Sequence, residues 1–159
     1  MSEAGRPGPP GGFAWARAAP GRLIGRGHPV GDFLDAPGWR VLEEAPGTLR
    51  LDCPMPVRVR NPRGQLFGGF APTYVDLIAL FTLRAGARDA PRRGWLATVS
   101  MRLDFYEPVV GDSFQVESRL QHRRSRNVWV ATRFLDAAGT PLLDALTVLR
   151  ETDVPFDEA

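Results

Sequence analysis

The sequence of 159 residues predicts an α+β fold, in which a curved antiparallel sheet of five to six strands wraps around one long central helix. Three observations predict it. Residues 70–85 form one long apolar segment with helix boundaries at both ends, and residues 95–106 alternate apolar and polar side chains. The segments that follow are separated by short connections, which favour antiparallel hairpins. A single sheet buries its apolar face most simply against the helix.

The first 27 residues are dense in Gly, Pro and Arg and show no hydrophobic period. Such a composition buries too little apolar surface to order itself, so we expect a mostly flexible tail at 1–27. Four apolar side chains of this tail are able to dock on the domain or on a partner: Phe13, Trp15, Leu23 and Ile24. The folded domain is expected at 28–152, with a short C-terminal tail at 153–159.

Two strands are expected before the long helix, after one short helix near residues 31–34. Residues 39–45 and 48–56 are rich in apolar and β-branched side chains and flank the turn Pro46-Gly47. These two segments therefore predict a hairpin.

The long helix is expected over residues 70–85. Pro72 fits its first turn, where no N–H donor is required, and Gly86 ends it. The segment is apolar almost all round, which predicts burial on most of its sides.

Four strand segments follow the helix. In the first, from Trp95 to Tyr106, the alternation places Met101 and Leu103 on one face and Thr98 on the other, polar face. The remaining three segments are 113–123, 128–136 and 142–150. A single sheet of this kind leaves its edges and one face uncovered, which favours pairing with a second copy of the chain.

Charge and composition exclude several classes of function. The net charge is only +2, and 18 acidic residues are mixed among 20 arginines, so nucleic-acid binding is not expected. The apolar stretch 70–83 is 14 residues long, whereas a membrane span needs roughly 20. There is no charged start followed by an apolar run typical of a signal peptide. We therefore expect a cytoplasmic protein without a membrane span.

The chain lacks the common motifs for cofactors, metals and Ser-His-Asp catalysis. It has two scattered histidines and one cysteine, Cys53, which predicts no metal site and no disulfide. Cys53 lies between apolar neighbours and is interpreted as a small buried side chain. No Walker A, Gly-x-Gly-x-x-Gly or Gly-x-Ser-x-Gly pattern is present, so no cofactor is expected.

The candidate site lies at the start of the long helix. Gly68 and Gly69 come directly before it, where the first N–H groups have no internal partner and carry partial positive charge. Such amides suit a carbonyl oxygen that gains negative charge, although the two glycines are also compatible with a simple tight turn. Asp76 is the only acidic residue between Pro72 and Arg88. It is interpreted as a base or nucleophile, with structural hydrogen bonding to the backbone as the alternative.

Helix pitch separates these two groups. Gly68 and Asp76 are eight residues apart, which is roughly 12 Å along a helix axis. A nucleophile and an oxyanion donor must both reach one carbonyl group. If the two groups share one reaction, Asp76 of one copy must face Gly68 of a second copy, and the site lies between subunits.

Three arginines cluster at the end of the strand segment 113–123 and in the turn after it. Arg123, Arg124 and Arg126 are concentrated in residues 121–127. The turn is interpreted either as a solvated loop or as a clamp for phosphate groups, whose geometry Arg matches.

Taken together, these residues resemble the hotdog-fold acyl-CoA thioesterases, in the branch typified by the phenylacetate-pathway (PaaI-like) enzymes. The resemblance covers about residues 30–150. The residues that carry it are Asn61, Gly64, Leu66, Phe67, Gly68, Gly69, Asp76, Thr98, Met101, Phe105, Pro108 and Gly111.

The resemblance implies roles for these residues. Asp76 would activate or orient the hydrolytic water, or attack as the nucleophile, with Thr98 close to it. The Gly68 N–H would polarise the thioester carbonyl, assisted by Asn61. Gly69 and Phe67 would contact the substrate.

The resemblance also implies what the protein binds. The three arginines of the turn would hold coenzyme A phosphates. The protein would be a dimer or tetramer that hydrolyses an acyl thioester without a metal or redox cofactor.

One departure from the family pattern concerns Phe67, where a histidine is usual. The backbone N–H survives this change, but a side-chain donor is lost and the pocket becomes more apolar. Two alternatives therefore stay open: a non-catalytic hotdog protein that binds acyl-CoA or a partner, and a thioesterase for acyl groups on an acidic carrier protein. A hotdog dehydratase is disfavoured, because the sequence around His28 matches that chemistry weakly.

Overall fold

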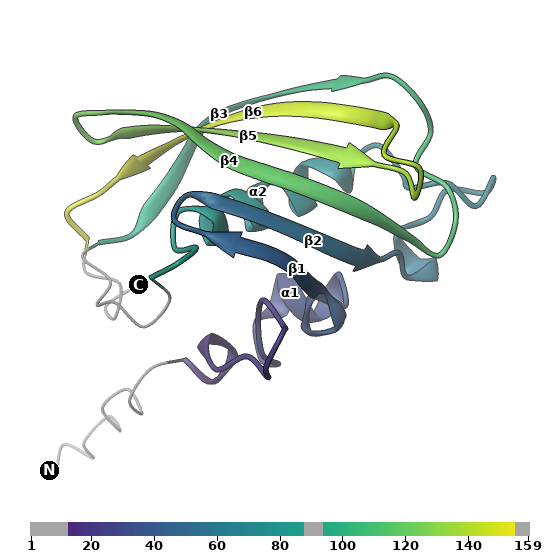
Figure 1. Cartoon of the computed structure of the whole chain (residues 1–159), viewed down its shortest axis with the longest axis horizontal. Helices are drawn as coiled ribbons and strands as arrows, with labels where there is room; N and C mark the ends of the chain where they lie inside the picture. The colour runs from purple at the N-terminus through teal and green to yellow at the C-terminus, as the bar shows by residue number, and fades with distance from the viewer. Residues whose placement is uncertain (1–12, 88–93, 155–159) are drawn as a thin grey trace, which may run out of the picture.

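The computed structural model describes residues 13–87 and 94–154 and shows one six-stranded antiparallel sheet (Figure 1). The strand order is β1-β2-β4-β5-β6-β3. The strands are β1 (Arg40–Ala45), β2 (Thr48–Pro54), β3 (Leu96–Phe105), β4 (Ser113–Arg124), β5 (Asn127–Leu135) and β6 (Pro141–Glu151). The helices are α1 (Pro29–Phe33), α2 (Ala71–Thr82) and the short 3-10 turns η1 (Ala14–Ala16), η2 (Ala36–Gly38) and η3 (Val57–Val59). The sequence-based prediction of the fold is confirmed.

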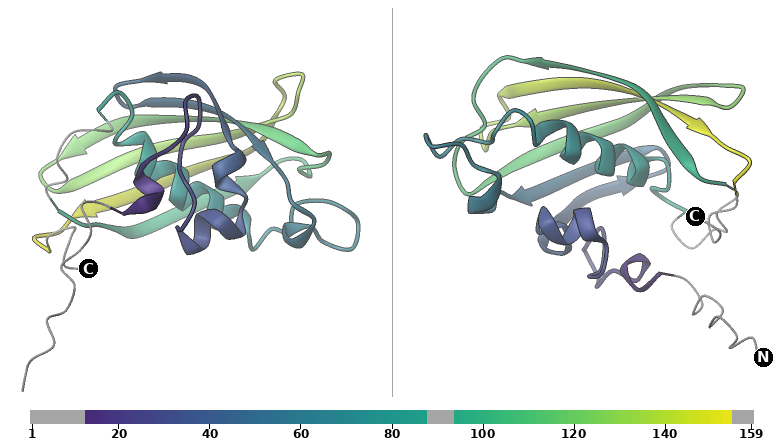
Figure 2. Two further views of the ribbon diagram at one scale, coloured as in Figure 1. Left: turned by 90° about the horizontal axis from the view of Figure 1, so that it is seen from below. Right: turned by 180° about the vertical axis from the view of Figure 1, so that it is seen from behind.

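The long helix α2 lies along the concave side of the curved sheet (Figure 2). It contacts β3, β4, β5 and β6. Pro72 occupies its first turn, as predicted. The helix ends at Thr82, three residues before the predicted end at residue 85, because the backbone tightens into turns there: Arg84 N donates to Phe81 O at 3.0 Å and Ala85 N to Thr82 O at 3.2 Å. Gly86, with a φ of +75°, follows these turns in the left-handed region that glycine adopts readily.

An aromatic cluster fixes the first half of α2 on the sheet. Tyr74 is fully buried and stacks on Trp39 with 5.4 Å between ring centroids. Its other edge-to-face partners are Phe114 of β4, at 5.3 Å, and Phe134 of β5, at 6.3 Å. Aromatic pairs in these geometries add about 0.5–1.5 kcal/mol each beyond the burial of their area. The rotation of α2 about its axis is therefore well determined at Tyr74.

A chain of buried hydroxyl groups fixes the second half of α2. Thr82 Oγ1 donates to Ile78 O at 2.8 Å and lies 2.7 Å from Ser118 Oγ of β4. Ser118 Oγ in turn lies 3.0 Å from Thr132 Oγ1 of β5. A buried hydroxyl costs free energy unless it is hydrogen-bonded, so these groups favour one position of the helix over the sheet.

The prediction that residues 1–27 form a mostly flexible tail has to be corrected for residues 13–27. Residues 1–12 fall outside the described residues, but residues 13–27 fold against the domain. Leu23 and Ile24 are buried in the main core. Composition alone suggested disorder, yet these two adjacent apolar residues find a surface to bury on, so the folded unit begins before residue 28. At the other end, residues 155–159 fall outside the described residues.

The two edges of the sheet differ. The backbone of the N-terminal segment covers the β1 edge, where Val41 N donates to Gly21 O at 2.9 Å and Arg22 bridges to Arg40. The β3 edge has no second strand partner within the described part of the chain. Of the two edges, β3 is therefore the one available for pairing with another chain.

The predicted unbroken alternation of β3 is wrong at Val99. The register with β6 passes from the pair Thr98–Leu149 directly to the pair Ser100–Val148, so Val99 forms a bulge. Leu149 is buried in one cluster with Ala79 of α2, which places Thr98 on the helix side of the sheet.

Beyond the bulge the helix side of β3 passes to the odd-numbered residues. Met101 and Leu103 pack against the main core, so they share the face of Thr98. An extra residue in a strand shifts the face of every residue after it, and this shift is why the sequence placed Thr98 on the wrong face.

Cys53 was predicted to be a small buried side chain, and the structure agrees. Cys53 is fully buried, and this burial raises the pKa of its thiol well above the ordinary value. The thiol therefore stays neutral and packs as an apolar group.

Candidate active site

The carboxylate of Asp76 lies on the one stripe of α2 that the protomer leaves half covered. Along this helix Tyr74, Val75 and Ile78 are buried, whereas Asp76 and Leu80, one turn apart, are half-buried. The helix was predicted to be buried on most sides, and this half-covered stripe is the side that is not fully buried. Its carboxylate does not bear the full cost of burial and remains accessible to a ligand.

Thr98 holds the Asp76 carboxylate across the space between α2 and β3. The Thr98 hydroxyl donates to Asp76 Oδ1 in a short hydrogen bond. The bulge at Val99 makes this contact possible, because it turns Thr98 toward the helix. One carboxylate oxygen is thus fixed in orientation, and Oδ2 remains for another partner. The sequence-predicted pair of Asp76 and Thr98 is brought together.

The Gly68 and Gly69 amides lie in the turn that leads into α2. Phe70 N donates to Phe67 O at 2.8 Å and closes this turn. Within residues 13–87 and 94–154, neither glycine N–H donates a hydrogen bond, and both residues are exposed. The two amides point to no acceptor of their own chain and are available to an external carbonyl oxygen.

The side chain of Asn61 is engaged in its own loop. Its Oδ1 accepts from Arg63 N at 2.9 Å and Gln65 N at 3.1 Å, and its Nδ2 donates to Gln65 Oε1 at 3.2 Å. This arrangement is an Asx-type turn, which shapes the loop before Gly68. The contacts that the structure shows for Asn61 are therefore structural.

Phe67 belongs to an exposed aromatic cluster at the start of α2. Its ring lies 5.8 Å from that of Phe70, and Phe70 lies 5.5 Å from Phe33 of α1. Phe67 is 53% exposed, which is unusual for a phenylalanine. An added Cβ on Gly69 would come within 2.8 Å of the Phe67 ring, so a larger residue there would displace this side chain.

The three arginines of the β4–β5 turn differ in their partners. Arg123 pairs with Glu151 at 2.6 Å, and Arg126 pairs with Asp153 at 2.6 Å. Arg124 forms no hydrogen bond or ion pair in the part of the chain that the structure describes, and it is exposed. Arg124 is thus the arginine of this turn whose charge is not already engaged.

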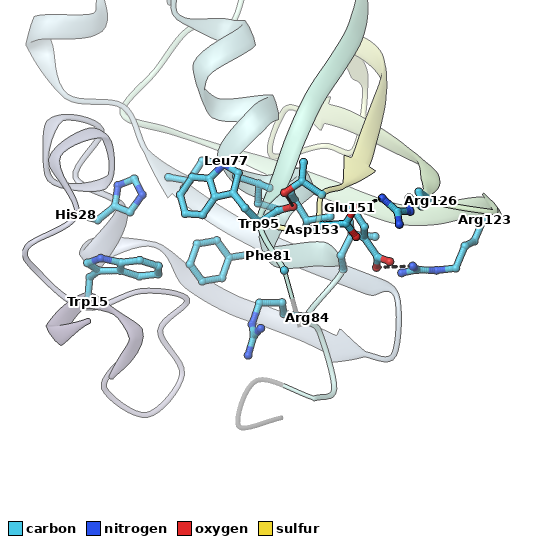
Figure 3. Close-up of a pocket in the computed structure, with 15 residues that line it drawn as sticks. Trp15, His28, Leu77, Phe81, Arg84, Trp95, Arg123, Arg126, Glu151 and Asp153 are labelled. Atoms are coloured by element: carbon cyan, nitrogen blue, oxygen red, sulfur yellow. Dashed lines mark hydrogen bonds and ion pairs between the residues drawn. The ribbon is translucent and has the colours of Figure 1, made fainter. Parts of the chain in front are cut away.

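A cavity of 510 Å³ lies against the part of α2 that follows Asp76, from Leu77 onward, and was not predicted from the sequence (Figure 3). It is formed by the second half of α2, the start of β3, the end of β6 and the N-terminal segment. Trp15 and Trp95 contribute to its wall. No sequence pattern links them, because the two residues come together only through the docking of the segment that precedes α1.

No group of His, Cys, Asp and Glu suited to a metal ion occurs among the described residues. In the same part of the chain, no helix has the length and apolar character that a membrane crossing requires.

The fold is found again in solved structures. No protein-family profile matches the sequence, and no curated protein matches it. A phenylacetic acid degradation-related protein from Ralstonia eutropha superposes with a TM-score of 0.66 at 18% identity, over 79% of this chain and 92% of that one. A thioesterase family protein from Silicibacter pomeroyi gives 0.62 at 19% identity, over 77% and 88%.

A third similar structure is a hypothetical thioesterase from Streptococcus pneumoniae crystallised with coenzyme A. It gives a TM-score of 0.62 at 12% identity, over 74% of this chain and 88% of that one. The chain has the hotdog fold. Mutants of the streptococcal protein, in which an aspartate and separately a threonine are replaced by alanine, also superpose on it. At these identities the likeness establishes the fold, and the fold is the one found in thioesterase-superfamily proteins.

Proposed function

We propose that this hotdog protein is a cytoplasmic, homo-oligomeric acyl-CoA thioesterase whose site lies between two subunits. The observation that carries the proposal is the Asp76 carboxylate, which is oriented by Thr98 and half-buried on the half-covered stripe of α2. Thioesterase structures of the same fold, one of them with coenzyme A, give it further support.

The reaction converts an acyl thioester and water into a carboxylic acid and a thiol. Asp76 Oδ2 accepts a proton from a water molecule, whose oxygen forms a bond to the carbonyl carbon. The carbonyl oxygen gains negative charge and accepts hydrogen bonds from the Gly68 N–H and its neighbour. The tetrahedral intermediate then breaks its C–S bond, and the proton passes to the leaving sulfur. Direct attack by Asp76 on the carbonyl carbon is the alternative first step, followed by hydrolysis of the anhydride.

A second subunit is required to bring the two groups to one carbonyl. Gly68 lies in the turn three residues before α2 begins at Ala71, and Asp76 lies about 7.5 Å along the axis beyond Ala71, so we infer that the two groups do not serve the same carbonyl within one copy. The half-open stripe of α2 and the unpaired β3 edge lie next to each other at the Asp76–Thr98 contact. On the β3 edge Val99 is 58% exposed, which suits an interface.

The experiment that tests this function measures the hydrolysis of a panel of acyl-CoAs by the amount of free thiol released. Turnover with several acyl groups supports the proposal. Binding of acyl-CoA without turnover favours the non-catalytic alternative. Turnover of acyl groups on carrier protein but not on coenzyme A favours the carrier-protein thioesterase.

Substitution of Gly68 by alanine tests the oxyanion role of its amide. An added Cβ meets no atom within 4 Å, and the backbone is not in the left-handed region, so stability should be unchanged. The methyl group would crowd a thioester bound against this amide, and we expect kcat/KM to fall at least about tenfold. Gly38→Ala is the matched control, because its nearest neighbour would be Pro54 Cγ at 4.0 Å. Equal activity of both variants would argue against a ligand at Gly68.

Substitution of Arg124 by alanine tests binding of the coenzyme A phosphates. Because Arg124 has no partner in the described part of the chain, we expect KM for acyl-CoA to rise roughly three- to fivefold at low salt, while kcat is unchanged. The effect should shrink as salt is added. Arg119→Ala, also on β4 and away from the turn, is the control. An unchanged KM would remove Arg124 from the binding site and leave the turn as a solvated loop.

A further inference from the structure

The cavity that follows Asp76 along α2 has an apolar part, a charged side and a wall supplied by the N-terminal segment. Its apolar lining comes from Leu77, Leu80, Phe81, Trp95, Leu96 and Trp15. Figure 3 shows Trp15 and His28 on one side of it, Phe81 and Trp95 in the middle, and the two arginine ion pairs on the other side. Its volume of 510 Å³ is within the usual range for small-molecule sites, about 300–1,000 Å³.

Two residues that line the cavity lie close in sequence to Asp76 and Thr98. Leu80 lies one helical turn after Asp76, on the same half-covered stripe, about 6 Å further along the axis. Leu96 lies two residues before Thr98, on the same face of β3. A group attached to a carbonyl at Asp76 therefore enters the cavity between Leu80 and Leu96.

Trp15 is held in place by the fold of its own segment. Its carbonyl oxygen accepts from Gly25 N at 2.8 Å, and the neighbouring Ile24 is anchored in the core. The indole meets the Phe81 ring of α2 edge-on at 6.4 Å and the His28 ring at 5.0 Å. Trp15 thus lies against α2 five residues beyond Asp76, which is about 7.5 Å along the axis.

Two of the three arginines that line the cavity are paired with carboxylates. The three are Arg84, Arg123 and Arg126, and Arg123 pairs with Glu151 and Arg126 with Asp153 at the β6 end. A phosphate would have to displace these carboxylates, whereas an apolar group meets leucine and aromatic surface without such a cost. The occupant that fits is an apolar chain.

We propose that the cavity receives the acyl chain of the substrate and that Trp15 closes its far end, so that Trp15 limits the length of chain that fits. This inference rests on the proposed thioesterase function. Trp15 is a specificity-determining residue supplied by the segment before α1. Replacing its indole by a methyl group lengthens the cavity and leaves Asp76 and Thr98 unchanged.

The test measures chain-length preference in wild type and in Trp15→Ala, with butanoyl-, octanoyl- and dodecanoyl-CoA. We expect the ratio of kcat/KM for dodecanoyl- over butanoyl-CoA to rise at least about tenfold, because a pocket discriminates by the methylenes it accommodates. Trp129→Ala is the matched control: Trp129 of β5 packs on His122 at 5.4 Å and does not line the cavity. If Trp15→Ala does not fold, Trp15→Leu shortens the same side chain.

A binding measurement separates this inference from the proposed function. Calorimetry with non-hydrolysable thioether analogues of the same three acyl-CoAs requires no turnover, and the affinity ratio should shift in the same direction. If wild type hydrolyses acyl-CoA but neither ratio differs between Trp15→Ala and the Trp129→Ala control, Trp15 does not set chain length. If hydrolysis is absent and the thioether ratio still shifts, the thioesterase function fails and the acyl site stands. If no thioether binds wild type, both are overturned.

Discussion

Replacement of Asp76 by asparagine is expected to lower kcat for acyl-CoA hydrolysis at least about 10²-fold, the usual range for the loss of a general base. Asparagine has nearly the same shape and its amide oxygen still accepts the Thr98 hydroxyl, so the local structure should persist. What is lost is the charge and the basic oxygen. The measurement is the initial rate of thiol release at saturating substrate, together with KM.

Asp104→Asn is the control for this experiment. Asp104 of β3 is half-buried, as Asp76 of α2 is. Unlike Asp76, it pairs with Arg102, and it lies after the bulge on the side of the sheet away from α2. Its substitution should leave kcat unchanged. Equal rates in wild type and Asp76→Asn would show that Asp76 has a structural role only.

The Thr98 hydrogen bond shows how one extra residue in a strand affects the candidate catalytic carboxylate of Asp76. With uninterrupted alternation, the residues of β3 that face α2 would be either Thr98 or Met101, but not both. The bulge at Val99 allows the same strand to present a hydroxyl to Asp76 and apolar side chains to the core. Bulges frequently have this use next to active sites, where they redirect a side chain.

Sequence patterns predicted the elements whose signals are local. The helix α2 and the six strands follow from apolar periodicity, and the start of α2 follows from Pro72, whereas its end at Thr82 comes before the one that Gly86 predicted. The bulge at Val99 was missed because it depends on how β3 pairs with β6. Pairing between distant strands leaves no mark in the alternation of one of them.

The candidate site was predicted only in part, because some of its residues stand out locally and others come together only through long-range contacts. Asp76 and Gly68 stand out in the sequence, because a carboxylate in an apolar helix and a glycine pair before it are locally unusual. The wall formed by Trp15 was missed, since it depends on burial of Ile24 in a core assembled from distant elements. The partners of Arg123 and Arg126 come from the end of β6, which no local signal connects to their turn.

Mixed dimers should recover activity that neither parent variant has. The two parents are Asp76→Asn and Gly68→Val, in which a branched side chain blocks the amide that would bind the carbonyl oxygen. If each site combines Asp76 of one subunit with Gly68 of the other, a heterodimer has one site with both defects and one site with neither. We therefore expect about half of the wild-type activity per dimer, because a two-fold interface forms two equivalent sites.

The heterodimer is isolated by co-expression with two affinity tags and purification on both, and its mass is checked by sedimentation. A second heterodimer, of Asp76→Asn with Asp76→Ala, is the control and must stay inactive, since every one of its sites lacks the carboxylate. If the site lies within one subunit, the first heterodimer is as inactive as its parents, because each subunit then carries its own defect. Activity in a protein that sediments as a monomer would exclude the shared site as well. The recovery of activity on mixing thus depends on the placement of Gly68 before the start of α2 and of Asp76 within α2, which no rearrangement of side chains within one copy changes.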